Sequence, residues 1–267
     1  MKKVKDYLVY GIIYLAAAVT FLSLIAIIAY IVINGIGGLS LSFFTQGGDE
    51  GIFPQIITTL YVIGLTLVIA VVIGIFSAIY LSEYAKQGKL VAVIRFAVDS
   101  LAGIPSIVYG LFGMLVFVGV LDLKYSILSG ALTLSIMVLP TIIRTTEETL
   151  KTVPMSYREG SLALGATKLR TIFKTVLPSA ISGIITAVIL SIGRIVGESA
   201  ALYFTAGMMA DIPKSIFDSG RTLTVHMFLL AKEGIDFEPV FATGTVLIII
   251  VLLVNLSANF VGKKLKK

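Results

Sequence analysis

QIITTLYVIGLTLVIAVVIGIFSAIYL, residues 55–81, is the stretch that decides the fold class of this 267-residue chain. It contains no charged side chain. A helix rises ~1.5 Å per residue and satisfies its own backbone hydrogen bonds, so about 20 apolar residues in a helix cross a hydrocarbon core of ~30 Å. We therefore predict that Gln55–Leu81 spans a lipid bilayer.

Five other long apolar runs have the same character. With 57% hydrophobic and 13% charged residues, the composition departs from that of soluble domains, in which about a quarter of residues are charged. No internal repeat divides the chain, which predicts a single membrane domain over residues 1–267. The predicted fold is all-α, a polytopic membrane bundle of six transmembrane helices. The further spans are expected at Tyr7–Ile33, Phe96–Val120, Ser126–Ile143, Ser179–Phe204 and Phe241–Val261.

The basic residues set the expected orientation in the membrane. If the segments between the spans are assigned alternately to the two sides, sixteen of the 21 Lys and Arg residues fall on one side. Such residues concentrate in the cytoplasmic segments of membrane proteins, so both chain ends are predicted to be cytoplasmic. The sixteen are Lys2, Lys3, Lys5, Lys86, Lys89, Arg95, Arg144, Lys151, Arg158, Lys168, Arg170, Lys174, Lys263, Lys264, Lys266 and Lys267.

The composition argues against several kinds of chemistry. The chain has no cysteine and a single histidine, His226, so neither disulfides nor a His/Cys metal site is expected. No G-x-x-x-x-G-K-[ST] loop occurs, so we expect the chain to bind no ATP and no other cofactor. The net charge of +6 lies in patches between apolar runs, which orientation in a membrane explains better than nucleic-acid binding.

Two connecting segments are too long to be simple loops. The segment Thr205–Pro239 is assigned to the outside and contains the apolar stretch Leu223–Ala231. We expect this stretch to lie on the outer surface as a short amphipathic helix. The second segment, residues 144–178, is assigned to the cytoplasm.

The cytoplasmic segment carries the signals of two short helices joined by a turn. Ser156 and Glu159 have the spacing of a capping box at a helix start. Gly165 would end this helix in a left-handed conformation, and Thr167 would cap a second helix running towards Pro178, where the fifth span begins. A basic segment of this kind either docks a soluble partner or rests on anionic lipid, and its local chemistry supports both equally.

Two charged residues fall within the fifth predicted span. Arg194 and Glu198 are four residues apart, so they would pair on one face of a helix. Each charge inside a membrane costs at least ~2.5–3.5 kcal/mol, and such residues usually face a cavity or a partner. Arg194 either extends to the outer interface or supplies positive charge to an anion path, in which Glu198 would orient it and moderate its field.

Two further patterns concern helix packing and helix breaks. Gly193 and Gly197 form a small-xxx-small pattern that is common where membrane helices pack closely. Arg95 and Asp99 are expected to pair with each other near the inner end of the third span. Pro105 should kink or interrupt that span, since proline lacks the amide that a helix needs.

Residues 158–178, REGSLALGATKLRTIFKTVLP, resemble the EAA loop of ABC-importer permeases. The pattern of that loop is Glu-Ala-Ala, three residues, Gly, nine residues, Ile, one residue and Leu-Pro. The matching positions are Glu159, Gly165, Leu177 and Pro178, and the substituted ones are Gly160, Ser161 and Thr175. In the family this loop sits in a cleft of the ATPase subunit. The resemblance therefore implies ATPase contact by Tyr157, Arg158, Glu159, Gly160, Ser161, Ala163, Leu164 and Gly165.

Three more stretches narrow the resemblance. LAGIPSIVYGLFG (101–113), AIYLSEYA (78–85) and SIGRIVGESAALYFTAG (191–207) are similar to phosphate-importer permeases of the PstA type. The resemblance implies a subunit of a prokaryotic inner or plasma membrane, surrounded by lipid, that forms half of a two-fold pore for inorganic phosphate. It implies three protein partners: an ATPase dimer that is PstB-like and binds the ATP, a second permease subunit that is PstC-like, and an extracytoplasmic phosphate-binding protein that is PstS-like. It also associates Arg194 and Glu198 with the transport path.

Three alternatives stay open at the level of the sequence. The first is a permease for another oxyanion, such as sulfate, molybdate or phosphonate. The second is a membrane scaffold that transports nothing. The third is a passive anion channel, for which the long cytoplasmic segment would have no assigned use.

Overall fold

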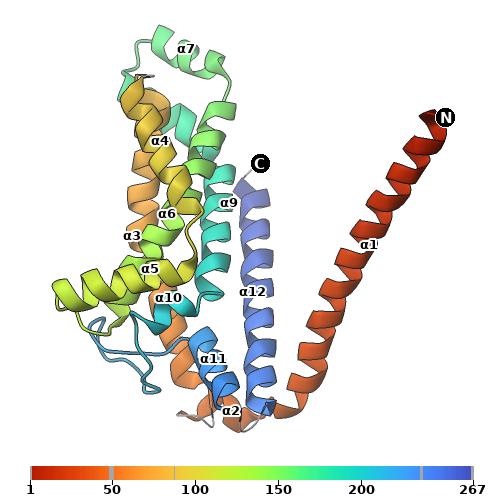
Figure 1. Cartoon of the computed structure of the whole chain (residues 1–267). Coiled ribbons are helices and arrows are strands. Elements are labelled where there is room, and N and C mark those ends of the chain that lie inside the picture. Colours follow the sequence, from red (N-terminus) through yellow and green to blue (C-terminus); the bar gives the residue numbers. More distant parts are fainter. Residues whose placement is uncertain (1, 48–50, 87, 235–236, 266–267) are drawn as a thin grey trace.

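The computed structural model describes residues 2–47, 51–86, 88–234 and 237–265, and every regular element within these ranges is helical (Figure 1). Five segments are long and apolar enough to cross a membrane. They are built on α1 (Lys2–Gly35), α3 (Phe53–Ile79), α6 (Ile127–Thr152), α9 (Leu177–Val196) and α12 (Glu238–Leu265). The all-α membrane bundle is confirmed, with five of the six predicted spans present as single helical segments.

The remaining predicted span, Phe96–Val120, is not a single straight helix. It is divided into α4 (Lys89–Ala102) and α5 (Ser106–Gly113), and α5 continues as a π-helical segment, η3 (Met114–Val120). The two halves meet at an angle of 103°, and together they can count as a sixth crossing. Figure 1 shows α5 running across the bundle rather than along it.

Pro105 explains the break, as the sequence predicts. Proline disfavours helical geometry in the residue before it and cannot donate an amide hydrogen bond, so α4 ends at Ala102 and Pro105 becomes the N-cap of α5. The Tyr109 hydroxyl donates to the Leu101 carbonyl at 2.7 Å, which satisfies one of the carbonyls left free at the end of α4. A side chain at Gly110 would lie 2.9 Å from the Ala201 Cα, so glycine is required for α5 to pack this closely.

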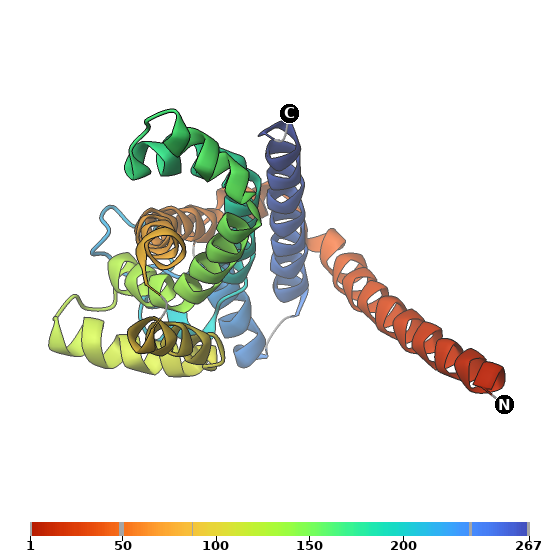
Figure 2. The ribbon, with the colours of Figure 1, turned by 90° about the horizontal axis from the view of Figure 1, so that it is seen from above.

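α6 forms the centre of the bundle and packs between α3 and α9 (Figures 1 and 2). Leu134, Met137 and Ile142 on α6 are fully buried. The buried Thr133 and Ser135 hydroxyls bond within the helix, to the Ser129 and Ala131 carbonyls at 2.8 and 2.6 Å, whereas the buried Thr146 hydroxyl has no partner among the described residues. A hydroxyl bonded in this way lies inside the apolar bundle without an unsatisfied donor.

α1 lies apart from the bundle, as the view in Figure 2 shows most clearly. Every side chain from Val9 to Ile28 is exposed. Contact with the rest of the chain is made near the other end of the helix, where Tyr30 packs edge-on against Phe241 of α12 with ring centroids 5.5 Å apart. Gly35 approaches Phe241 and Thr245 so closely that a side chain would not fit there.

The shorter elements lie at the ends of the long helices. α11 (Leu223–Glu233) was expected to rest on the outer surface, and this is wrong: Leu223, Thr224, Val225 and His226 are buried, because the start of α11 packs on α12 and α3. The helix itself is confirmed. The other short elements are η1 (Ile36–Gly38), α2 (Leu41–Thr45), η2 (Tyr80–Tyr84), α7 (Met155–Ala163), α8 (Lys168–Thr171), η4 (Ile172–Val176) and α10 (Ala200–Tyr203), of which η2 and η4 are π-helical.

The two ends of the chain lie on the same side of the bundle. Figure 1 shows the start of α1, the end of α12 and the projecting helix α7 at one end, with α2 and α11 at the other. An even number of crossings produces this arrangement. We refer to the two ends as the α7 end and the α11 end.

Candidate functional site

The projecting segment at the α7 end consists of α7, α8 and the turn between them, residues 164–167. The helix begins one residue before the predicted capping box, because Pro154 occupies the N-cap position with extended geometry and no side-chain cap bond forms. Ser156 and Glu159 therefore lie inside α7, and the capping box is a wrong prediction. Pro154 still starts the helix through its carbonyl, which accepts the Tyr157 amide at 3.2 Å.

The turn after α7 confirms the predicted role of Gly165. Its φ is +81°, a left-handed conformation that glycine adopts without strain. The Gly165 amide donates to the Leu162 carbonyl at 2.9 Å and the Ala166 amide donates to the Ser161 carbonyl at 3.2 Å, the bond pair of a Schellman motif. These bonds fix the angle at which the chain leaves α7.

Thr167 caps α8 as predicted, since its Oγ accepts the Arg170 amide at 3.3 Å. The second short helix is not separate from the fifth span, however. α8 continues through the π-helical turn η4 into α9, with Pro178 in the first turn of α9. A π turn widens the helix by one residue, which accommodates a proline that cannot bond to the preceding turn.

The structure divides the eight predicted contact residues into two groups. Six are exposed to solvent beyond the bundle: Tyr157, Glu159, Gly160, Ala163, Leu164 and Gly165. Leu164 is the extreme case, with 91% of its surface exposed. The remaining two, Arg158 and Ser161, are partly buried and bond to the protein itself, so they do not form part of the outward surface.

Arg158 joins α7 to the end of α3. Its Nη2 lies 2.6 Å from Oε1 of Glu83 in η2, and the two side chains are only 13% and 8% exposed. Arg158 also donates to the carbonyls of Leu150 and Val153 at 2.9 and 2.8 Å, where α6 ends. Glu83 is a functional residue that the local sequence does not predict; the available signal is a carboxylate at the end of a charge-free apolar run.

Arg194 and Glu198 do not form the predicted ion pair. α9 ends at Val196 with Gly197 as its C-cap, so the helix stops before Glu198 and the span is shorter than the predicted Ser179–Phe204. Oε1 of Glu198 instead accepts the Ala201 amide at 3.0 Å at the start of α10. Among the residues that the structure describes, no carboxylate lies within 4 Å of the Arg194 guanidinium.

The surroundings of Arg194 are nevertheless informative. Arg194 is partly exposed in the last turn of α9, where a cation is favoured by the helix dipole. No atom lies within 4 Å of a side chain built at Gly193, so the close helix packing predicted from the glycine pattern does not occur within this chain at that position. The surface of α9 at Gly193 is therefore open to whatever lies beside this chain.

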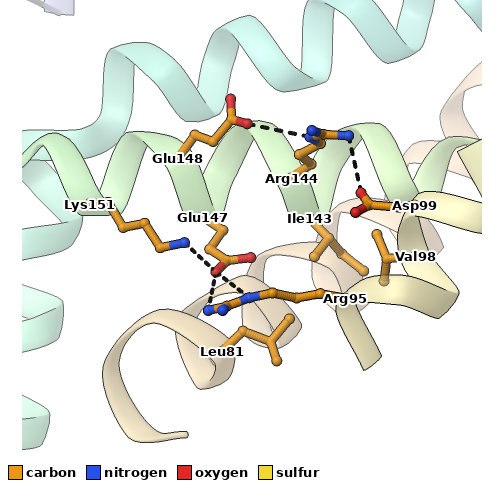
Figure 3. Close-up of a pocket in the computed structure, with 9 residues that line it drawn as sticks. All are labelled: Leu81, Arg95, Val98, Asp99, Ile143, Arg144, Glu147, Glu148 and Lys151. Carbon is orange, nitrogen blue, oxygen red and sulfur yellow. Dashed lines mark hydrogen bonds and ion pairs between the residues drawn. The ribbon is translucent and has the colours of Figure 1, made fainter. Parts of the chain in front are cut away.

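A charged cluster at the α7 end links α4 to α6 (Figure 3). Arg95 was expected to pair with Asp99, but each pairs with α6 instead: Arg95 with Glu147 at 2.7 Å and Asp99 with Arg144 at 3.0 Å. Lys151 also binds Glu147 at 2.7 Å. These side chains line a cavity of about 190 Å³ in which positive and negative charges neutralise one another, so the cavity is a poor anion site.

Together, the membrane-spanning bundle and the exposed helical segment at one end define a multi-pass membrane protein with a folded projection at that end. The described residues contain no group of His, Cys, Asp and Glu side chains that could hold a metal ion. Comparison with known proteins identifies the family. The chain belongs to the binding-protein-dependent transport system inner membrane components, whose family model matches residues 70–267. It is thus a multi-pass inner-membrane permease subunit.

Individual relatives extend this similarity over the whole chain. A probable ABC transporter permease of Bacillus subtilis, YqgI, is 36% identical and covers 100% of this chain and 98% of its own length. The phosphate transport system permease PstA of Pasteurella multocida is 33% identical over 97% of this chain and 94% of its own. Among solved structures, a bacterial alginate ABC transporter bound to its periplasmic protein has a TM-score of 0.74 at 14% identity, over 98% of this chain and 96% of that one, which supports the fold alone.

Proposed function

We propose that this chain is one membrane subunit of an ATP-driven importer that moves inorganic phosphate into a prokaryotic cytoplasm. The projecting segment carries the proposal. It holds an exposed apolar surface, including Tyr157 and Leu164, at the end of the bundle where the basic residues gather. Exposed apolar side chains on a well-formed helix and turn favour a protein partner over water.

The α7 end is the cytoplasmic end in this proposal. The positive-inside distribution supports this orientation, and it places both chain ends in the cytoplasm. A soluble ATPase dimer would bind the exposed side of α7 and the 164–167 turn, and it would bind the ATP, since this chain has no phosphate-binding loop. The chain itself would then need no cofactor, and residues 1–267 would act as one permease domain.

A second membrane subunit completes the proposed pore. Two surfaces of this chain support such a partner: the exposed length of α1 and the open side of α9 around Gly193. Lipid would cover the remaining apolar surface. At the α11 end, an extracytoplasmic phosphate-binding protein would deliver the cargo.

The cargo follows from the relatives and from the chemistry of Arg194. Relatives named PstA match most of the chain at 33–36% identity, which favours phosphate over sulfate, molybdate or phosphonate. A guanidinium donates two parallel hydrogen bonds to an oxyanion, and Arg194 is partly exposed in the last turn of α9. Glu198 would act next to it by shaping the start of α10 rather than by pairing with it.

Uptake of labelled phosphate by cells that contain the complete importer tests this function. We expect phosphate to compete with the label and equal concentrations of sulfate, molybdate or phosphonate not to compete. Arg194→Gln should lower uptake roughly 10- to 100-fold, because a charge-assisted hydrogen bond is worth about 1.5–3 kcal/mol. Lys232→Gln, an equal loss of charge at an exposed site on α11, is the control and should retain uptake. If unlabelled phosphate does not compete with the label, phosphate is not the cargo. If Arg194→Gln retains normal uptake, Arg194 has no role in transport and only stabilises the end of α9.

A further inference from the structure

The projecting segment is bound to the bundle by side chains as well as by the chain itself. Along the chain, the segment connects only α6, which precedes it, and α9, which follows it through η4. α3 ends 79 residues before Arg158, yet the π-helical turn η2 at its end reaches the segment through Glu83. The contact between them is therefore made by side chains alone.

The centre of this contact is the Glu83–Arg158 pair. Two nitrogens of Arg158 bind the carboxylate, Nη2 at 2.6 Å from Oε1 and Nε at 3.2 Å from Oε2. The remaining donors bind the Leu150 and Val153 carbonyls at the end of α6. One planar guanidinium thus joins α7, α3 and α6, a geometry that a lysine ammonium cannot reproduce.

The neighbouring residue of η2 makes a second contact. The Lys168 ammonium at the start of α8 lies over the Tyr84 ring, 4.7 Å from its centroid. Two consecutive residues of η2, Glu83 and Tyr84, therefore hold one residue from each helix of the projecting segment. A pair of contacts on two helices restrains rotation of the segment as well as its distance from α3.

We propose that Glu83 and Arg158 are positioning residues that tie the projecting segment to α3, so that a displacement of α7 moves α3 together with α6 and α9. The inference rests on the proposed function, since the displacement is the one that an ATPase would impose. The burial of Arg158 supports this inference. Its side chain is 13% exposed and is hydrogen-bonded to Glu83, Leu150 and Val153, so it has little surface left for a partner protein. Arg158 then acts beneath the docking surface and not as part of it.

Glu83→Gln tests the tie with little change of shape. In the assembled importer we expect the ATPase to copurify and hydrolyse ATP as in the wild type, while phosphate uptake per ATP falls at least about tenfold because a buried guanidinium loses its counter-charge. For Arg158→Lys, we expect phosphate uptake per ATP to lie between the wild-type value and that of Glu83→Gln. Glu148→Gln is the matched control, because that carboxylate lies at the same end but is 66% exposed. Normal uptake per ATP in Glu83→Gln, or loss of ATPase binding by Arg158→Lys, would overturn the proposal.

A second measurement needs neither a variant of the pair nor transported cargo. The chain has no cysteine, so spin labels can be placed at Lys86→Cys and Ser156→Cys, two exposed positions beyond η2 and on α7. We expect the label distance to stay the same in the nucleotide-free and ATP-bound complexes. A change in that distance would show that α7 moves independently of η2, and it would refute the proposed connection between the projecting segment and α3. Failure of the proposed function has a different signature: wild-type protein that neither recruits an ATPase nor takes up phosphate.

Discussion

The turn at Gly165 allows a quantitative test of the docking surface. Its φ of +81° is a conformation that costs an L-residue ~1–2 kcal/mol, and no atom lies within 4 Å of a side chain built there. The cost of Gly165→Ala is therefore purely conformational. If the ATPase requires the native turn, its affinity should fall about 5- to 30-fold, since 1.4 kcal/mol corresponds to a factor of ten.

Gly160 provides the matched control. It is also exposed and also free of neighbours within 4 Å, but it lies within the helix α7. Gly160→Ala should favour the helix by ~0.5–1 kcal/mol and leave docking intact. Gly165→Asn should be milder than Gly165→Ala, because asparagine tolerates left-handed geometry.

The assay is a titration of purified ATPase onto the permease in lipid nanodiscs. The expected order of affinity is wild type and Gly160→Ala first, then Gly165→Asn, then Gly165→Ala. Equal binding by all four proteins would refute the role of the turn. An equal loss at both glycines would show that the added methyl group, and not the backbone conformation, is responsible.

Three further outcomes are expected. Gly110→Ala should lower the melting temperature in detergent by several degrees, because the added methyl group would clash with the α10 backbone at a cost of about 1–3 kcal/mol. Gly64→Ala is the control and should not lower the melting temperature, because a methyl group there meets no atom within 4 Å. Glu147→Gln should destabilise the protein by about 1–3 kcal/mol in a thermal melt, since a carboxylate that is 9% exposed holds two cations; an unchanged melt would show that the cluster contributes nothing. Thr167→Ala should remove about 0.5–2 kcal/mol of capping from α8 and speed hydrogen exchange of the Arg170 amide, and unchanged exchange would contradict that cap.

Local signals predicted the features that depend on local physics. Five spans follow from apolar length, the break at Pro105 from a missing amide, and the Gly165 turn from backbone freedom. In each case the neighbouring residues alone determine the conformation. These features could therefore be read without knowledge of the tertiary structure.

The features that could not be predicted depend on partners distant in the chain. Arg95 had an acceptable partner four residues away, but α6 offers Glu147, which a local pattern cannot reveal. Glu198 likewise binds the Ala201 amide after α9 has ended, so the four-residue spacing no longer places Glu198 on the same helix face as Arg194. The direction in which Arg158 points is set by Glu83, 75 residues earlier.

The isolated position of α1 has a geometric consequence. A 34-residue helix is ~50 Å long, and the contacts with α12 that the structure describes lie near one end of this helix. A tilt of ~5° about that contact swings the opposite end through ~4 Å, with few bonds inside the chain to resist it. A neighbouring molecule that binds the free end of α1 would consequently set the tilt angle of the whole helix, and the small contact at Tyr30 and Gly35 would be the pivot.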